Sequence, residues 1–405
     1  MRIIVRLLFI TAFVVLLAGC NPSKTNDAYS PVAAYDKVNN RYLTIYIKSN
    51  DEFYPESHTD VEARIYGRFI GPGGELLGDE FVIYEASTDF DEFYCPSLRY
   101  DGVYGRFLVV WSANWDKSNT YAQLVNADGT PSGPVRVLSN AANSCSAVAY
   151  DGAQSVFLAL WGEQNGSLYA QLIGTDGSLT GSKFLVSNNA EQAPSVAYDS
   201  GNQRFLAAWS SADFLSIQGR IVNPDGSFLA PEFSIYAAAG NQSRPTIAYD
   251  SINSRFLAAW EHTEGGDYSL LGQVLNADGS LYQTAFTISS AGIDVNNHAL
   301  TYDPVGQEYF AVFADNKSKK IYSQLVTAQG VLDTTVSNDN LLLSYQNYPG
   351  DDEPTIAYDS ANRRYLASWS YLADGQINKD IHGRIVNSDG TPLGDIFVLS
   401  NGGAW

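Results

Sequence analysis

The hydrophobic residues of this chain fall into short runs rich in Val, Ile, Leu, Tyr, Phe and Trp, which are separated by polar turns. One phrase recurs: an apolar run, a Tyr-Asp pair with a turn, and a second apolar run that ends in an aromatic residue. Copies read PSLRYDGVYGRFLVVW from Pro96 and PTIAYDSINSRFLAAW from Pro245. Both alternating faces of the second run are apolar, which predicts a strand that is buried on both sides. No segment after residue 20 has a helical period, so an all-β fold is expected.

The aspartate of this phrase marks a repeat. Its separations along the chain are 65, 50, 48, 51, 53 and 56 residues, and seven copies at a period near 50 indicate a repeat architecture. The aspartates are Asp36, Asp101, Asp151, Asp199, Asp250, Asp303 and Asp359.

Each copy has a second half with two further apolar runs, as in IQGRIVNPDGSFLAPEFSIY from Ile217. In five copies an Asp-Gly pair separates these runs and supplies the positive φ that tight hairpins require. The pairs begin at Asp128, Asp176, Asp225, Asp278 and Asp389. Each repeat is therefore predicted to be a four-stranded antiparallel meander.

A sheet that is apolar on both faces needs neighbours on both sides, and a closed ring provides them. A linear stack would need polar end caps, but the first and last copies carry the same pattern as the others. Over essentially all of 30–405, the repeat resembles the β-propeller repeats of secreted and cell-surface bacterial proteins. It lacks the kelch diglycine, the WD40 signature pairs and the sialidase Asp-box. The resemblance implies a seven-bladed β-propeller of four-stranded antiparallel blades, and it carries no catalytic residues across.

The amino terminus predicts export. Residues 1–19 contain two arginines followed by an apolar run that is too short to cross a bilayer, as in a signal peptide. Leu17-Ala18-Gly19-Cys20 resembles the lipobox of bacterial lipoproteins, which implies that Cys20 is the first mature residue and carries the lipid, including palmitate. Residues 20–29 would form a tether, and Asn21 favours the outer membrane where there is one. The alternative is an ordinary cleaved signal with a chance cysteine.

The chain is acidic, with 24 basic and 44 acidic side chains. Loss of Arg2 and Arg6 with the signal would leave a net charge of −22. Such a body repels phosphate backbones, so nucleic acid is not an expected partner, and membrane contact is expected through the lipid alone.

Two cysteines provide a test of the predicted ring arrangement of the blades. Cys95 and Cys145 each lie six residues before a repeat aspartate, so they occupy one structural position in consecutive blades. If the first strand of each blade is innermost, these positions crowd around the axis, and a disulfide is expected after export. The alternative is two free thiols, because Cα atoms more than about 7 Å apart cannot be bridged. The other blades hold Ser30, Ala193, Arg244, Asn297 and Glu353 at this position, which predicts a polar channel mouth of mixed charge.

The repeated residues have structural interpretations. The aspartate of each Tyr-Asp pair is expected to open the turn after the first strand by accepting backbone N–H groups. The tryptophans that end the second strand are expected in the core: Trp111, Trp161, Trp209, Trp260 and Trp369. No calcium-loop pattern and no zinc spacing of the four histidines occurs, so no metal or cofactor is expected.

The irregular features suggest a binding surface. The tetrapeptide Asp-Glu-Phe-Tyr occurs twice, first between strands two and three of blade one and then between blades one and two, and both connections leave the same face of the disc. Exposed aromatic rings beside carboxylates stack on sugars or anchor protein partners. The alternative is that these loops are solvated and turn their rings inward. The candidate ligand-binding residues are Asp51, Glu52, Phe53, Tyr54, Asp91, Glu92, Phe93, Tyr94, Trp115, Tyr348 and Tyr371.

Together these features predict a non-catalytic envelope or cell-surface lipoprotein that binds a protein or glycan partner through this loop-rich face. Two alternatives stay open. One is a carbohydrate-active hydrolase with two carboxylates at the channel mouth, and the other is a purely structural scaffold of an envelope complex.

Overall fold

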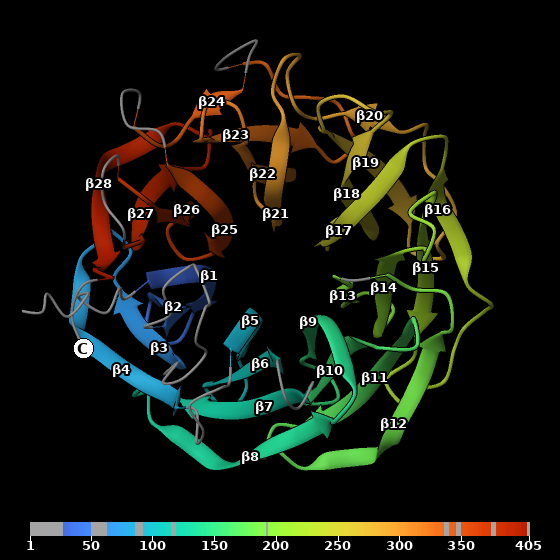
Figure 1. Cartoon of the computed structure of the whole chain (residues 1–405), viewed down its shortest axis with the longest axis horizontal. Helices are drawn as coiled ribbons and strands as arrows, with labels where there is room; N and C mark the ends of the chain where they lie inside the picture. Colours follow the sequence, from blue (N-terminus) through green and yellow to red (C-terminus); the bar gives the residue numbers. More distant parts are fainter. Residues whose placement is uncertain are drawn as a thin grey trace, which may run out of the picture.

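Seven four-stranded sheets stand around a central axis in the computed structural model (Figure 1). It describes residues 27–49, 63–85, 92–114, 119–191, 193–335, 340–345, 350–373 and 378–402. Blade one comprises β1 (Asp27–Asp36), β2 (Arg41–Ser49), β3 (Ala63–Ile70) and β4 (Leu76–Glu85). Blade two comprises β5 (Glu92–Asp101), β6 (Arg106–Asn114), β7 (Asn119–Asn126) and β8 (Pro131–Ser139). Blade three comprises β9 (Ala142–Asp151), β10 (Val156–Glu163), β11 (Ser167–Gly174) and β12 (Leu179–Ser187). Blade four comprises β13 (Ser195–Asp199), β14 (Arg204–Ser210), β15 (Ser216–Val222) and β16 (Phe233–Ala237), and blade five comprises β17 (Asn241–Asp250), β18 (Arg255–Thr263), β19 (Ser269–Asn276) and β20 (Phe286–Thr287). Blade six comprises β21 (Val295–Asp303), β22 (Glu308–Asp315), β23 (Lys320–Thr327) and β24 (Leu341–Leu342). Blade seven comprises β25 (Asp351–Asp359), β26 (Arg364–Tyr371), β27 (Asp380–Asn387) and β28 (Pro392–Ser400).

Each blade is an antiparallel meander whose strands pair in chain order. The first strand of each blade lies innermost, and the fourth lies at the rim (Figure 1). The predicted all-β, seven-bladed propeller is therefore confirmed, and no helix occurs in the described part of the chain. Consequently, none of the described residues forms a helix that is long and apolar enough to cross a membrane. β1 begins at Asp27, three residues before the expected boundary at residue 30.

The ring closes between blades seven and one without a shared strand, because β1–β4 and β25–β28 are each continuous in sequence. Contacts across this seam hold it together. The backbone N–H of Ala28 donates to the Lys379 carbonyl at 3.0 Å, and Arg68 donates to the Leu399 carbonyl at 2.7 Å.

The second strands form the cores between blades. In β10 every residue is buried, and the five predicted core tryptophans are completely buried. Between blades one and two, Leu43 and Ile45 of β2 pack with Trp111 of β6. This burial on both faces explains why the second apolar run of each repeat shows no polar alternation.

The repeat aspartates act as predicted. Asp199 is fully buried, and its Oδ1 accepts the backbone N–H groups of Gly201 and Asn202 at 3.0 and 2.9 Å. The Asp-Gly hairpins are confirmed as well: Gly226, for example, has φ 85°, and Asp225 accepts the Ser227 N–H at 2.9 Å.

The tyrosine of each Tyr-Asp pair interacts with the aspartate of the preceding blade, which the sequence analysis did not foresee. Tyr358 donates to Asp303 at 2.5 Å. Burial, and then the neighbouring aspartate, raises the pKa of each of these phenols above its usual value, and Tyr35 pairs with Asp359 across the seam between blades seven and one. The other pairs are Tyr100–Asp36, Tyr150–Asp101, Tyr198–Asp151, Tyr249–Asp199 and Tyr302–Asp250.

Candidate functional site

The two ends of the central channel differ. We call the end where the inner strands begin the mouth face, and the end with the Tyr-Asp turns the turn face. One residue per blade surrounds the channel near the mouth face, and we call this set the mouth ring: Ser30, Cys95, Cys145, Ala193, Arg244, Asn297 and Glu353.

A local irregularity of the inner strands presents the mouth ring. Six of its seven residues have a left-handed backbone, with φ between 48° and 64°. In β1, β5, β17, β21 and β25 the strand register shifts at this point. Such bulges re-aim a side chain relative to the regular pleat. The next residue is proline in five blades, and the missing proline N–H is tolerated where the ladder is already interrupted.

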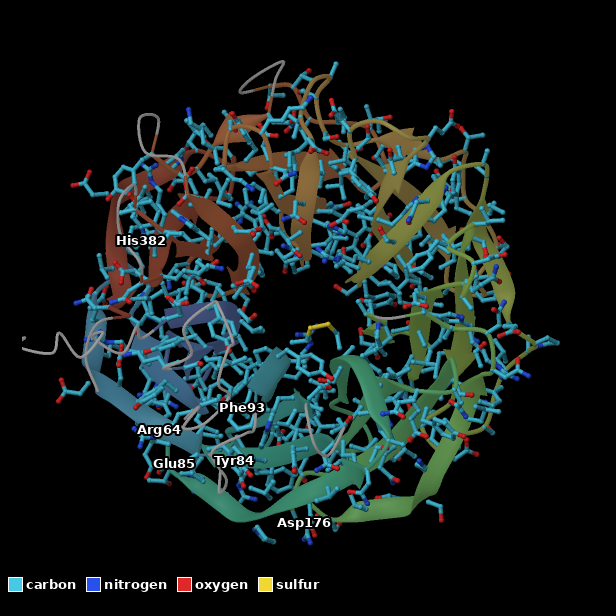
Figure 2. All side chains as sticks on the ribbon, in the orientation of Figure 1. Arg64, Tyr84, Glu85, Phe93, Asp176 and His382 are labelled. Carbon is cyan, nitrogen blue, oxygen red and sulfur yellow. A yellow bond between two sulfur atoms is a disulfide. The ribbon has the colours of Figure 1, made fainter. Side chains whose placement is uncertain are left out.

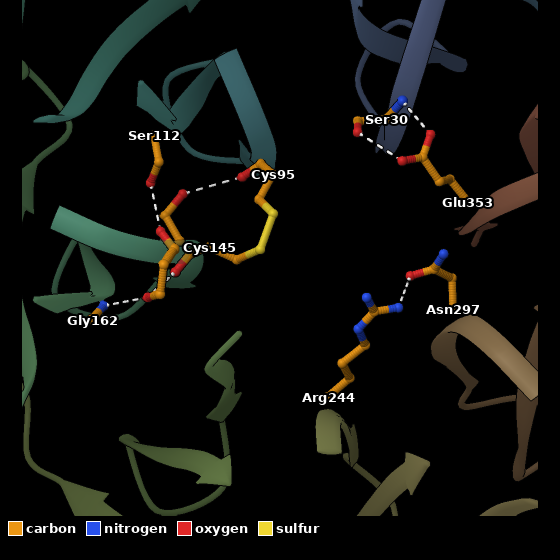
Figure 3. The surroundings of a disulfide bond; sticks show 10 residues. Ser30, Cys95, Ser112, Cys145, Gly162, Arg244, Asn297 and Glu353 are labelled. Atoms are coloured by element: carbon orange, nitrogen blue, oxygen red, sulfur yellow. Dashed lines mark hydrogen bonds between the residues drawn. A yellow bond between two sulfur atoms is a disulfide. The ribbon is translucent and has the colours of Figure 1, made fainter. Parts of the chain in front are cut away.

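Three pairs of mouth-ring residues link neighbouring blades (Figure 3). Cys95 and Cys145 form a disulfide with a Cα separation of 4.9 Å, which confirms the predicted bridge between blades two and three. The bond is possible because equivalent positions of adjacent inner strands converge on the axis. Its place at the channel edge is visible in Figure 2.

The second pair joins blades seven and one. The Glu353 carboxylate accepts the Ser30 backbone N–H at 2.9 Å, the Ser30 hydroxyl at 3.3 Å and the Ser370 hydroxyl at 3.1 Å. This negative charge is therefore held in place by donors of two blades.

The third pair joins blades five and six. The Arg244 guanidinium donates to the Asn297 amide oxygen at 2.5 Å and lies 3.8 Å from the Glu261 carboxylate. Glu261 also accepts the Asn297 backbone N–H at 2.9 Å, and Asn297 donates onward to Asp352 of blade seven at 3.1 Å. The Arg244 side chain is still 49% exposed. The predicted mouth of mixed charge is thus present, with its charges arranged as inter-blade links.

Two cavities occupy the channel. The mouth cavity, of about 390 Å³, lies beneath the mouth ring, and the turn cavity, of about 750 Å³, opens toward the turn face. Arg99 lines both of them. The turn cavity is bordered by the tyrosines of all seven Tyr-Asp pairs, and Lys37 is its second cation.

Arg99 is a functional candidate that the sequence analysis missed. It stands two residues before Asp101, where the other blades carry Ala34, Ala149, Ala197, Ala248, Thr301 and Ala357. Protein surrounds it, so burial lowers the pKa of its guanidinium, but its side chain is exposed to the interior of the channel. The available signal was a lone basic residue at an otherwise small position of the repeat.

The predicted loop surface lies largely outside the described residues. This applies to Asp51, Glu52, Phe53, Tyr54, Asp91, Trp115 and Tyr348, and to the lipidation site Cys20.

Two residues of that predicted surface are corrected by the structure. Glu92, Phe93 and Tyr94 begin β5 and do not form a free connection. Phe93 is 1% exposed, and its ring lies beside Tyr84 and Trp111 with centroid distances of 5.5 and 6.5 Å (Figure 2). Phe93 was therefore wrong as a ligand-binding residue, because its position in the strand turns it into the core between blades one and two.

Tyr371 was also wrong as an exposed aromatic. It ends β26, is 8% exposed and stacks on His382 with a centroid distance of 4.2 Å. Burial lowers the pKa of His382 to about 4, so this imidazole is neutral at physiological pH and serves as an aromatic core partner.

Among the described residues, no group of three or more His, Cys, Asp or Glu side chains has the geometry to hold a metal ion. The carboxylates at the mouth, Glu353, Asp352 and Glu261, all accept hydrogen bonds from neighbouring blades.

Comparisons with known proteins support the fold. No family model and no curated protein sequence matches this chain. Among solved structures, it is similar to the BP39L lectin from Burkholderia pseudomallei (TM-score 0.61, 11% identity, 92% of this chain and 99% of that chain). It is also similar to a putative 6-phosphogluconolactonase from Bacteroides uniformis (0.54, 14%, 93% and 98%). A third is the β-propeller domain of the Trilobed protease from Pyrococcus furiosus, described as having an open velcro topology (0.53, 7%, 94% and 100%). At these identities the likeness concerns the β-propeller architecture alone.

Proposed function

We propose that this chain is a lipid-anchored protein of the bacterial cell envelope that binds a protein or glycan partner, without catalysis, through its mouth face. The proposal combines the lipobox-like amino terminus with the asymmetry of the mouth ring.

That asymmetry is the observation on which the proposal depends. On the turn face every blade repeats the same Tyr-Asp pair. On the mouth face one repeat position carries a serine, two cysteines, an alanine, an arginine, an asparagine and a glutamate. A partner that docks in a single orientation needs a surface without seven-fold symmetry, because specificity comes from particular side chains at particular places.

The hydrogen bonding of the mouth carboxylates favours binding over hydrolysis. A glycosidase needs one carboxylic acid that releases its proton to the leaving group and a second carboxylate that acts as nucleophile or base. Here Glu353 holds Ser30 and Ser370, and Asp352 holds Asn297. Recruiting either carboxylate for chemistry would break a link between blades or within blade seven.

The test compares partner capture by three forms of the mature protein: wild type, a mouth-face variant and a turn-face control. The mouth-face variant is Phe53→Ala/Tyr54→Ala/Arg244→Ala, which omits Phe93 because its removal would open a core cavity. The control is Ile252→Ala/Val305→Ala, whose side chains are 53% and 58% exposed on the turn face and do not line the turn cavity. Each form is used in a pull-down from envelope extracts and on a glycan array.

Binding that is lost in the mouth-face variant and kept in the control is expected. Equal binding by both variants would overturn the assignment of the face, and the absence of any ligand would favour the scaffold alternative. A panel of polysaccharides incubated with wild type checks for turnover, and turnover would replace the binding proposal with the hydrolase.

The anchor is tested separately with Cys20→Ser. Wild type is expected to incorporate a palmitate analogue and to fractionate with membranes, whereas the variant is expected to do neither. Labelling that persists in Cys20→Ser would show that Cys20 is not the lipid site.

A further inference from the structure

The channel contains a cation without a counter-charge. The Arg99 guanidinium makes one hydrogen bond within the described chain, from Nη1 to the carbonyl of its neighbour Leu98 at 2.8 Å. No ion pair joins it to a carboxylate of the described residues, although the chain has a net charge of −20. A guanidinium carries five N–H donors, so most of its hydrogen-bonding capacity is directed elsewhere.

The fold does not need arginine at this position. Five other blades place alanine there and the sixth places Thr301, and each inner strand keeps the same pairing with its second strand. The Arg99 side chain is exposed within the channel, so its charge is open to solvent or to a ligand and is not needed for the packing of the inner strand.

The turn-cavity side of Arg99 favours an anion, whereas the mouth cavity that Arg99 also lines includes Glu353, whose carboxylate accepts hydrogen bonds from Ser30. The lining of the turn cavity includes Lys37 and Arg99 but no carboxylate from the described residues. The repeat aspartates lie nearby, but they are at most 1% exposed and are turned toward backbone amides of the turns. Lys37 extends from blade one across Gly102 of blade two, so both cations stand on the same side of the cavity.

Hydroxyl groups in the mouth cavity, which Arg99 also lines, add donors. Ser97 and Ser195 line the mouth cavity, and each uses its oxygen to accept a backbone N–H of the next blade, from Val148 at 3.2 Å and from Ile247 at 3.1 Å. A hydroxyl that accepts in this way still has its hydrogen to donate.

We propose that the central channel is a binding site for a small organic anion, whose carboxylate, sulfate or phosphate group is held by Arg99 and whose body lies in the turn cavity among the tyrosines. A guanidinium binds such oxyanions through two parallel charge-assisted hydrogen bonds. A cavity of about 750 Å³ has the size of ordinary small-molecule sites. Arg99 also lines the mouth cavity, but the partner surface is tested at Arg244 and the loops and the anion site at Arg99, so the failure of one proposal is distinguishable from the failure of the other.

The experiment measures binding by calorimetry at constant ionic strength. The probes are glucuronate as an organic carboxylate, glucose 6-phosphate and glucose 6-sulfate as monoesters, and glucose as the neutral control. The central variant is Arg99→Ala, which places in blade two the residue that five other blades carry. Arg136→Ala is the matched control, because it removes one positive charge from the outer strand β8, away from the channel.

At least one anionic probe is expected to bind wild type with a dissociation constant below about 1 mM, while glucose does not. Arg99→Ala is expected to weaken that binding at least about tenfold, Arg99→Lys to weaken it less, and Arg136→Ala to leave it unchanged. The probe that binds tightest identifies the oxyanion class. Binding of no anionic probe, or equal binding by Arg99→Ala and wild type, overturns the proposal. The denaturant midpoint of unfolding of Arg99→Ala is expected to equal or exceed that of wild type, so a loss of binding would not be explained by a loss of folding.

Discussion

The carboxylate of Glu353 accepts the backbone N–H of Ser30 at 2.9 Å, although 323 residues separate the two along the chain. This bond closes the ring at the mouth face, where blades seven and one share no strand. The same repeat position that forms a disulfide between blades two and three thus forms a polar link at the seam.

The hydrogen bonds between Glu353 and Ser30 predict that substitutions at these two residues lower the free energy of unfolding by different amounts. Glu353→Ala leaves the Ser30 N–H without its acceptor, so we expect the free energy of unfolding to fall by about 1–3 kcal/mol. Ser30→Ala keeps that N–H and loses only the hydroxyl bond, at a cost of about 0.5–1.5 kcal/mol. Urea unfolding measures both, and hydrogen exchange is expected to accelerate in β1 and β25 of Glu353→Ala before other blades. Equal destabilisation by both substitutions would contradict the assigned role of the backbone bond.

The disulfide predicts a redox-dependent stability. Cys95 and Cys145 enclose a loop with a sequence separation of 50 residues, so Cys95→Ser/Cys145→Ser is expected to lower the free energy of unfolding by about 2–4 kcal/mol. Denaturant unfolding of wild type with and without reductant provides the comparison. The double variant should be insensitive to reductant. A wild type whose unfolding midpoint does not respond to reductant would argue against a stabilising bridge.

The Tyr-Asp hydrogen bonds between blades predict that substituting the aspartate destabilises the fold more than substituting the tyrosine. Tyr358→Phe removes one inter-blade hydrogen bond and is expected to cost about 1 kcal/mol. Asp303→Ala is expected to cost more, because it also leaves the Val305 N–H without its acceptor and removes the partner of Arg363. Thermal unfolding ranks the two. Neither variant should alter partner binding at the mouth face, and a Tyr358→Phe variant less stable than Asp303→Ala would refute this account of the turn.

Asp351 predicts a pH dependence of stability. Burial raises the pKa of this carboxyl to about 7, although Trp369 donates to it at 2.6 Å. Between about pH 4 and 7 the native state keeps a proton that the unfolded state has released, so this group destabilises the fold increasingly as pH rises through that window.

Asp351→Asn keeps an acceptor for Trp369 and cannot ionise. Its advantage over wild type is expected to grow from near zero at pH 4 to at most about 4 kcal/mol above pH 7. The measurement is denaturant unfolding at a series of pH values. Burial also raises the pKa of Glu308 to about 7, so this residue likewise destabilises the fold as pH rises. Its contribution is present in both proteins and cancels in the difference between the variant and wild type. A difference that does not change with pH would show that Asp351 does not titrate in this range.

Local patterns along the chain determined much of this protein. The alternation of apolar runs, the spacing of the repeat aspartates and the Asp-Gly pairs predicted seven four-stranded blades, because strand burial and turn conformation depend on near neighbours. The pairing of Cys95 with Cys145 followed from the same repeat, since equivalent positions of adjacent blades must meet at the axis.

The tertiary structure decided where individual side chains point. Phe93 belongs to the core because β5 begins earlier than the sequence suggested, and Tyr371 is covered by His382 of the neighbouring strand. The links of Arg244 and Glu353 depend on left-handed bulges, and the exposure of Arg99 depends on the open axis of the ring. None of these directions is encoded by neighbours in sequence, because each results from closing seven sheets around one channel.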